Sequence, residues 1–111
     1  MTSTAWTLSI PQNRVQEFRA LLADLNRNHL PGLDARARKV GYHRERMWLQ
    51  PDVDGSARLI VYLELDEGVD MVTFPERLLA HESEFTRWWT PRFSSFGLPR
   101  AVGEPLLSWD A

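Results

Sequence analysis

The chain has 111 residues, a length that supports one folded domain and is too short for two domains with separate cores. Hydrophobic residues make up 43% of the sequence, which argues against intrinsic disorder. The 13 lysines and arginines are outnumbered by 15 aspartates and glutamates, and the net charge of -2 argues against general nucleic-acid binding, which needs a positive excess. Cysteine is absent, so disulfides, cysteine nucleophiles and thiolate metal sites are excluded.

The first residues lack the features of a targeting segment, since residues 1–13 have neither a basic start nor a long apolar stretch. No window of the sequence approaches the roughly 18 apolar residues that a membrane-spanning helix needs. We therefore expect a soluble cytoplasmic protein that binds neither a membrane nor nucleic acid.

The first part of the chain has a strand pattern followed by a helix pattern. Apolar and polar residues alternate over residues 5–10, which predicts a half-buried strand. Apolar residues then recur at steps of three and four over residues 15–29, so we expect an amphipathic helix. The Leu-Pro-Gly segment at 30–32 should break or kink this helix, which resumes over 34–40 with Gly41 past its end.

The second part begins with two β-rich runs, 41–50 and 57–65, whose Pro/Asp/Gly connection predicts an antiparallel hairpin. A short helix is expected after Pro75, and Ser83 is the expected N-cap of a further, aromatic helix. The tail, residues 103–111, would supply a last strand. The order β-α-β-β-α-β over residues 1–111 predicts a single α+β domain of ferredoxin-like type, with a four-stranded antiparallel sheet and helices on one face.

Alternation divides the predicted hairpin into two faces. The aliphatic residues at odd positions from 59 to 65 should pack on the helices, together with Met47, Leu49 and His43. The opposite face then carries aromatic and ionisable groups, namely Tyr42, Arg44, Arg46, Trp48, Gln50, Ile60, Tyr62 and Glu64, with Thr7 and Ser9 from the first strand.

This mixed face allows two interpretations. Aromatic walls with a few donors and acceptors are typical of a small-molecule pocket. Alternatively, the face is solvated, and Arg46 and Glu64 form a cross-strand ion pair of a few tenths of a kcal/mol. Because exposed aromatic residues such as Trp48 and Tyr62 are unusual on a sheet, we expect the face to be covered by another sheet or to close over a cavity.

Three segments, ERMWLQPDVDGSARLIVYLE, FTRWW and FGLPRAVGEP, give the chain a recognisable pattern from Glu45 to Glu104. It resembles a family of uncharacterised small bacterial proteins of the ferredoxin-like, dimeric α/β-barrel type. Thr86 departs from that pattern, where an Asp is usual, as do Leu98 with Pro99 and an expanded loop at 68–74. The resemblance implies a homodimer that packs through the open sheet faces, with a cavity between sheet and helices or at the dimer seam.

The wider dimeric-barrel group includes antibiotic-biosynthesis monooxygenases, polyketide cyclases, haem-degrading enzymes and members without known activity, so the fold alone leaves function open. Here Glu64 is the candidate base, and Arg46 or Tyr62 would polarise a carbonyl or phenolate of the substrate. Burial would raise the pKa of this carboxyl and a neighbouring arginine would lower it, so the sequence leaves the sign open. The expected substrate-binding residues are Trp48, Trp88, Trp89, Arg44, Thr7 and Ser9. Of the adjacent tryptophans, one should enter the core while the other caps a cavity or a dimer seam.

The three histidines are candidates for catalytic or ligating groups. His81, in the loop before the aromatic helix, is a candidate acid or base at a pocket mouth. His29 is expected to be a core or helix-terminal residue. No histidine or carboxylate spacing supports zinc, and haem-degrading relatives carry a ligating histidine on the second helix where this chain reads FTRWW, so we expect no metal and no cofactor. Most of the basic residues Arg36, Arg38, Lys39, Arg44 and Arg46 should form a solvated face, with an anion site as the alternative.

Together these features predict a small-molecule-binding homodimer. The favoured function is a cofactor-independent enzyme that cyclises, isomerises or oxygenates an aromatic or polyketide-like compound. The alternative is a non-catalytic ligand-binding or dimerisation module, in which the same residues serve only the interface.

Overall fold

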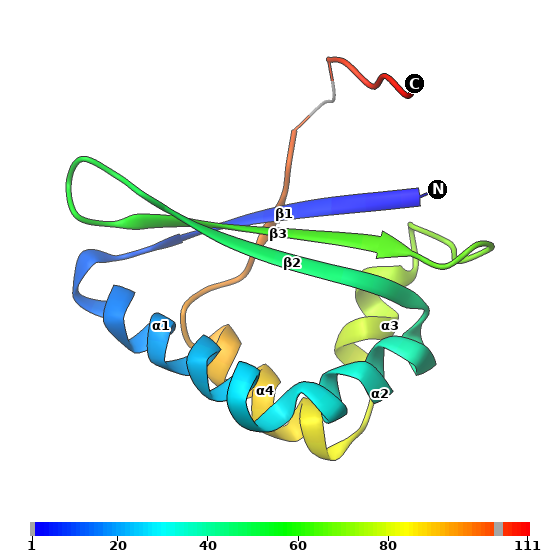
Figure 1. Cartoon of the computed structure of the whole chain (residues 1–111), viewed down its shortest axis with the longest axis horizontal. Helices are drawn as coiled ribbons and strands as arrows, with labels where there is room; N and C mark the ends of the chain where they lie inside the picture. Colours follow the sequence, from blue (N-terminus) through cyan, green and yellow to red (C-terminus); the bar gives the residue numbers. More distant parts are fainter. Residues whose placement is uncertain (1, 104–105) are drawn as a thin grey trace.

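A computed structural model describes residues 2–103 and 106–111 and shows an antiparallel sheet with all of the described helices on one side (Figure 1). The strands are β1 Thr2–Ile10, β2 Tyr42–Pro51, β3 Ala57–Leu65 and the short β4 Arg100–Ala101. Their order across the sheet is β2-β3-β1-β4, and every neighbouring pair is antiparallel. This confirms the predicted α+β class with a four-stranded antiparallel sheet and is compatible with a ferredoxin-like fold.

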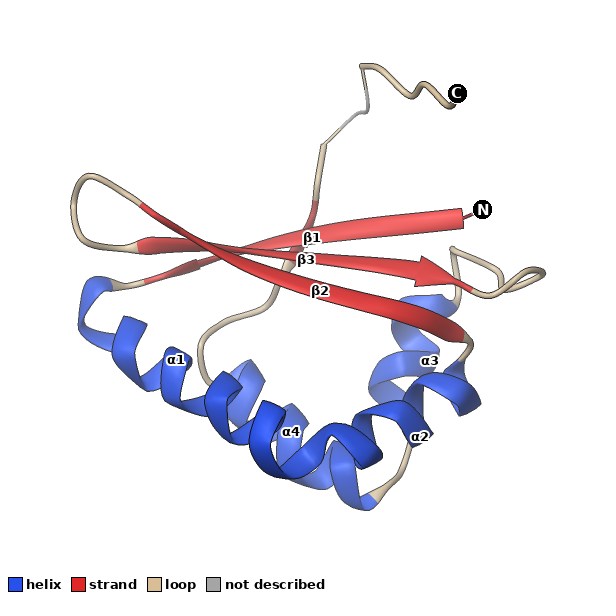
Figure 2. Ribbon diagram, viewed as in Figure 1, coloured by secondary structure: helices blue, strands red, loops and turns tan. Residues whose placement is uncertain are grey.

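The helices cover what we call the inner face of the sheet and leave the opposite, open face without helical cover (Figure 2). They are α1 Val15–Asp24, α2 Leu30–Val40, α3 Phe74–Ala80 and α4 Glu84–Ser94, with a 3-10 turn at Gln12–Arg14. As predicted, α4 starts at Ser83, whose hydroxyl oxygen accepts a hydrogen bond from the Thr86 amide.

The expected break at residues 30–32 takes a different form, because the chain stays helical from α1 into α2. A π turn, Leu25–His29, joins the two helices, and Pro31 lies in the first turn of α2. A proline ring clashes with the carbonyl of the residue four positions earlier, here Arg27. The wider π turn lies directly before the proline and accommodates this missing hydrogen bond without ending the helix.

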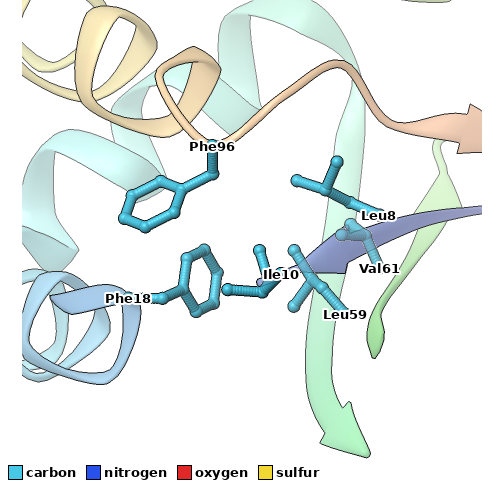
Figure 3. Packing of buried hydrophobic residues seen from close by; sticks show 6 residues of the cluster. All are labelled: Leu8, Ile10, Phe18, Leu59, Val61 and Phe96. Atoms are coloured by element: carbon cyan, nitrogen blue, oxygen red, sulfur yellow. The ribbon is translucent and has the colours of Figure 1, made fainter. Parts of the chain in front are cut away.

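The hydrophobic core lies between the inner face and the helices. Figure 3 shows one of its clusters, in which Phe18 of α1 and Phe96 after α4 meet the strand residues Leu8, Ile10, Leu59 and Val61. The two phenylalanine rings pack edge to face, with centroids 5.1 Å apart. The aliphatic side of β3 therefore packs on the helices, as its alternation predicts.

A β-bulge at the start of β2 makes two face assignments wrong. The register with β3 shifts between Tyr42 and Arg44, so that Tyr42 lies opposite Leu65 and Arg44 opposite Glu64. Tyr42 is therefore buried on the inner face, 3% exposed, while His43 contacts Glu64 from the open face. Simple alternation assumes an uninterrupted strand, and the extra residue of a bulge inverts the faces on one side of it.

The last strand also differs from the prediction. It is Arg100–Ala101, which pairs with Trp6 and Thr7 of β1 and precedes the predicted tail. Residues 104–105 of that tail lie outside the described residues, and 106–111 form no strand. Within the described part of the chain, no helix has the length and apolar character needed to cross a bilayer.

Candidate functional site

A cavity of about 180 Å³ lies between the inner face of the sheet and the helices. Most of its lining is apolar. The sheet contributes Trp6, Met47, Val61 and Leu63, α3 contributes Leu78, and α4 contributes Trp89 and Phe93. Trp89 and Phe93 stack with their ring centroids 5.0 Å apart, because residues four apart on a helix share one face. Two charged residues, Arg36 and Glu45, also line it, and the rest of the lining is Pro75, Leu79, Thr90, Ser94, Gly97, Leu98 and Pro99.

Arg36 lies on the inner side of α2 and is only 5% exposed, so its predicted place on a solvated surface is wrong. Its Nε donates a hydrogen bond of 3.2 Å to the Tyr42 hydroxyl, and its guanidinium lies over the Phe85 ring, 4.9 Å from the centroid. A Cβ at Gly32 would lie 2.9 Å from the Cβ of Phe85. This glycine lets α2 and α4 approach closely enough for Phe85 to cover the arginine.

Glu45 faces Arg36 from β2, where it lies opposite Leu63. Its side chain is 13% exposed, and its Oε1 is 4.0 Å from Nη2 of Arg36, which is too long for a hydrogen bond. Among the buried side-chain atoms described, Oε1 of Glu45 lacks any hydrogen-bond partner. Burial raises the pKa of Glu45, and the charge of Arg36 and the Tyr42 hydroxyl only partly oppose this effect.

This inner cluster (Arg36, Tyr42 and Glu45) has the composition of an acid–base site. A buried carboxyl with a raised pKa holds a proton more readily than a free one, which suits a group that gives and takes a proton. Beside it, a buried guanidinium can stabilise negative charge that forms on a bound molecule. Burial also raises the pKa of Tyr42, so its hydroxyl stays protonated.

Sequence reasoning missed Glu45, although one signal could have found it. By alternation, Glu45 belongs to the same face as Met47 and Leu49, which were assigned to the helix side. A carboxylate within an otherwise apolar set is a candidate for a buried functional group. The aromatic residues of the open face favoured instead the other carboxylate of the hairpin, Glu64.

The predicted catalytic residues Glu64 and Tyr62 do come together, on the open face. Glu64 is 5% exposed, and its Oε1 accepts hydrogen bonds from the Tyr62 hydroxyl at 2.9 Å and from Nη1 of Arg44 at 3.2 Å. Nε2 of His43 lies 3.4 Å from its Oε2. The hydrogen bond from Tyr62 lowers the pKa of Glu64, as do the charges of Arg44 and His43, although partial desolvation opposes them. Glu64 is thus a carboxylate with satisfied acceptors, which makes it a weak base.

Arg46 lies on the predicted open face but does not pair with Glu64. The register of the hairpin puts Arg44 opposite Glu64 and Arg46 opposite Tyr62, so the expected Arg46–Glu64 pair is an Arg44–Glu64 pair. Trp48 is 50% exposed, and its ring centroid lies 6.5 Å from that of Tyr62. Thr7 and Ser9 lie further along the open face, opposite Ile60 and Arg58, away from the Glu64 end of β3.

The remaining candidates lie on the helical side. Trp89 is 5% exposed and lines the cavity, whereas Trp88 stacks on His29 with ring centroids 3.5 Å apart. One of the two tryptophans is therefore buried, as expected of adjacent helical positions. Trp88 is not part of the cavity lining, and its expected place at a dimer seam stays a prediction. His81 ends α3, half-buried, and is part of neither the cavity lining nor the Glu64 cluster.

Over residues 2–103 and 106–111, no three histidine, aspartate or glutamate side chains converge in a way that could hold a metal ion. In comparisons with known proteins, no family model matches the chain and no curated protein is significantly similar to it. The resemblance noted from Glu45 to Glu104 therefore stays a prediction. The candidate site is therefore the cavity with its inner cluster of Arg36, Tyr42 and Glu45.

Proposed function

We propose that this protein binds a small molecule in the cavity and exchanges a proton with it through Glu45. The observation that carries the proposal is a carboxyl group in an apolar cavity, with one oxygen unpartnered and a buried guanidinium 4.0 Å away. Buried polar groups in proteins are almost always hydrogen-bonded, and a missing partner calls for an explanation. A ligand that supplies the partner explains it.

The reaction class that fits this site is acid–base conversion of an aromatic or polyketide-like compound without a cofactor. Isomerisation and cyclisation need proton transfer and charge stabilisation alone, whereas oxygenation also consumes dioxygen. Glu45 moves the proton, and Arg36 stabilises the oxyanion that forms. Tyr42 positions the guanidinium through its hydrogen bond to Nε. The aromatic side chains of Trp89 and Phe93 provide surface for a ring and keep water out.

A second candidate function is dimerisation through the open face, without catalysis. It is favoured by Trp48, which leaves half of its surface exposed beside Tyr62 on a sheet face that no helix covers. If two copies of the chain paired through their open faces, each would bury the Trp48 of the other. Dimerisation and ligand binding use opposite faces of the sheet, so each can be tested without disturbing the other.

Two matched variants test where the function resides. Glu45→Gln and Glu64→Gln each replace a mostly buried carboxyl by an amide of the same shape, one on each face of the same hairpin. Thermal unfolding is measured with a panel of aromatic alcohols, ketones and acids, since a ligand of the folded state raises the melting temperature. We expect a compound that stabilises the wild type and the Glu64→Gln variant but not Glu45→Gln. The opposite pattern would place the site on the open face, and stabilisation of neither wild type nor variants would refute ligand binding.

A further inference from the structure

The volume of the cavity limits the size of its ligand. A closed apolar cavity of about 150 Å³ in a protein interior accommodates benzene. The present cavity, about 180 Å³ and partly open to solvent, has room inside for one aromatic ring with small substituents. Fused ring systems would fit only by leaving part of their framework outside. This narrows the aromatic or polyketide-like class to single-ring compounds.

The charges of the inner cluster limit the charge of the ligand. Arg36 and Glu45 are each other's nearest countercharge, and ionised they sum to zero. A carboxylate ligand would add a second negative charge beside Glu45, with a single guanidinium to offset both. A cationic ligand would face Arg36. Burying an unpaired charge is costly, so a neutral molecule fits best.

The unpartnered carboxylate limits the chemistry of the ligand's polar group. When Glu45 is ionised, its unpartnered Oε1 needs a hydrogen-bond donor, which ketones, ethers and plain hydrocarbons do not supply. The guanidinium of Arg36 can donate to an acceptor on the ligand. A hydroxyl group does both, and the protein already shows this arrangement, since the phenolic hydroxyl of Tyr42 accepts from Nε of Arg36 at 3.2 Å.

We propose, building on the function proposed above, that the cavity binds a neutral single-ring phenol whose hydroxyl lies between Glu45 and Arg36. The O–H bond of the phenol breaks, its electron pair stays on the phenol oxygen, and the proton forms a new O–H bond on Glu45. The resulting phenolate is paired with Arg36 in place of the Glu45 carboxylate. No net charge is created in the apolar cavity, because the negative charge only moves from one oxygen to another. The ring carbons conjugated with that oxygen thereby become electron-rich.

The test uses three probes of nearly the same shape: 4-nitrophenol, 4-nitrotoluene, which lacks the hydroxyl, and 4-nitrobenzoate, which carries a charge. Binding is measured by calorimetry at a pH well below the pKa of 4-nitrophenol, so that the free probe is neutral, and the visible absorbance of 4-nitrophenol separately reports its phenolate. We expect 4-nitrophenol to bind about 10-fold or more tightly than 4-nitrotoluene, the difference expected for one hydrogen bond to a charged group. Nitrobenzoate should bind more weakly than either.

Variants separate the hydroxyl contact from the cavity itself. Glu45→Gln should lower the affinity for 4-nitrophenol to that for 4-nitrotoluene, and Glu64→Gln should leave it unchanged. Arg36→Met should reduce the phenolate absorbance of the bound probe. If Glu45→Gln folds poorly, the Arg36→Met variant still tests the proposal.

The possible failures are distinguishable. Equal affinity for 4-nitrophenol and 4-nitrotoluene would overturn the phenol inference while leaving the cavity as a small-molecule site. Tighter binding of 4-nitrobenzoate would also overturn it and would indicate an anion-binding cavity. If no probe binds, and Leu78→Trp, which fills the cavity, only stabilises the protein, both this inference and the proposed function fail.

Discussion

Replacing Arg36 by methionine would isolate the charge of Glu45 and reveal what the guanidinium contributes. Methionine keeps most of the apolar stem that packs beside Phe85 and Tyr42 but removes the positive charge. Removing one partner of a buried ion pair costs about 3–5 kcal/mol. Here the pair is separated by 4.0 Å and Glu45 retains 13% exposure, so we expect the lower end, about 3 kcal/mol at pH 7.

The loss should depend on pH in a defined direction. Burial already raises the pKa of Glu45, and removing Arg36, which lowers it, raises it further. A folded-state pKa above the unfolded value means that the folded protein binds the proton more tightly, so stability falls as pH rises from the unfolded pKa through the folded one. Below about pH 4 the carboxyl is protonated in both states, and the charge effect disappears.

Urea denaturation of the wild type and the Arg36→Met variant at pH 7 and pH 4 measures the loss of stability and its dependence on pH. With a slope of about 1.5 kcal/mol per M, a loss of 3 kcal/mol lowers the urea midpoint by about 2 M at pH 7. The double variant Arg36→Met with Glu45→Gln should recover most of this difference, because no buried charge is left unpaired. An equal loss at both pH values would refute the reasoning, since it would show that packing rather than charge is responsible.

Three further predictions concern other parts of the molecule. Hydrogen bonding lowers the pKa of Glu64 in the folded protein. The ionised Glu64 therefore stabilises the fold above the unfolded pKa, and this stabilisation is lost as pH falls through the folded pKa. Glu64→Gln should accordingly flatten the acid side of a plot of melting temperature against pH. Gly32→Ala should destabilise the protein by about 1–2 kcal/mol in chemical denaturation despite its better helix propensity, because the new Cβ would lie 2.9 Å from that of Phe85; a stabilised variant would mean that α2 and α4 can move apart. Trp48→Lys should shift the sedimentation coefficient to that of a monomer if the open face joins two copies, and an unchanged coefficient would rule out that interface.

Much of the fold follows from local sequence signals. The alternation of β3, the Pro/Asp/Gly connection of the hairpin and the serine before α4 each act within a few residues, and each predicted its element. The π turn could not be predicted from the sequence, because Pro31 indicates an interruption of the helix without specifying whether the helix ends or widens.

The site was harder to predict than the fold. Arg36 has the sequence context of a surface helix, with Arg38 and Lys39 close by, and only the approach of α4 through Gly32 buries it. The burial of Tyr42 depends on the bulge, and strand alternation does not report bulges. The open-face pair of Glu64 and Tyr62 was predicted correctly, because both residues lie on the regular strand β3, where alternation holds.

The bulge at His43 has a consequence for recognising relatives of this protein. In a regular strand, residues two or four apart share a face, so Tyr42 and Glu45 would point to opposite sides. Glu45 is inside by regular alternation, and the one extra residue brings Tyr42 inside beside it. The same residue places His43 outside, next to Arg44, against Glu64. A single insertion thus contributes one residue to each cluster. Sequences that share this cavity should therefore conserve the distance of three between the tyrosine and the glutamate, and a one-residue deletion there should also remove the histidine contact with Glu64.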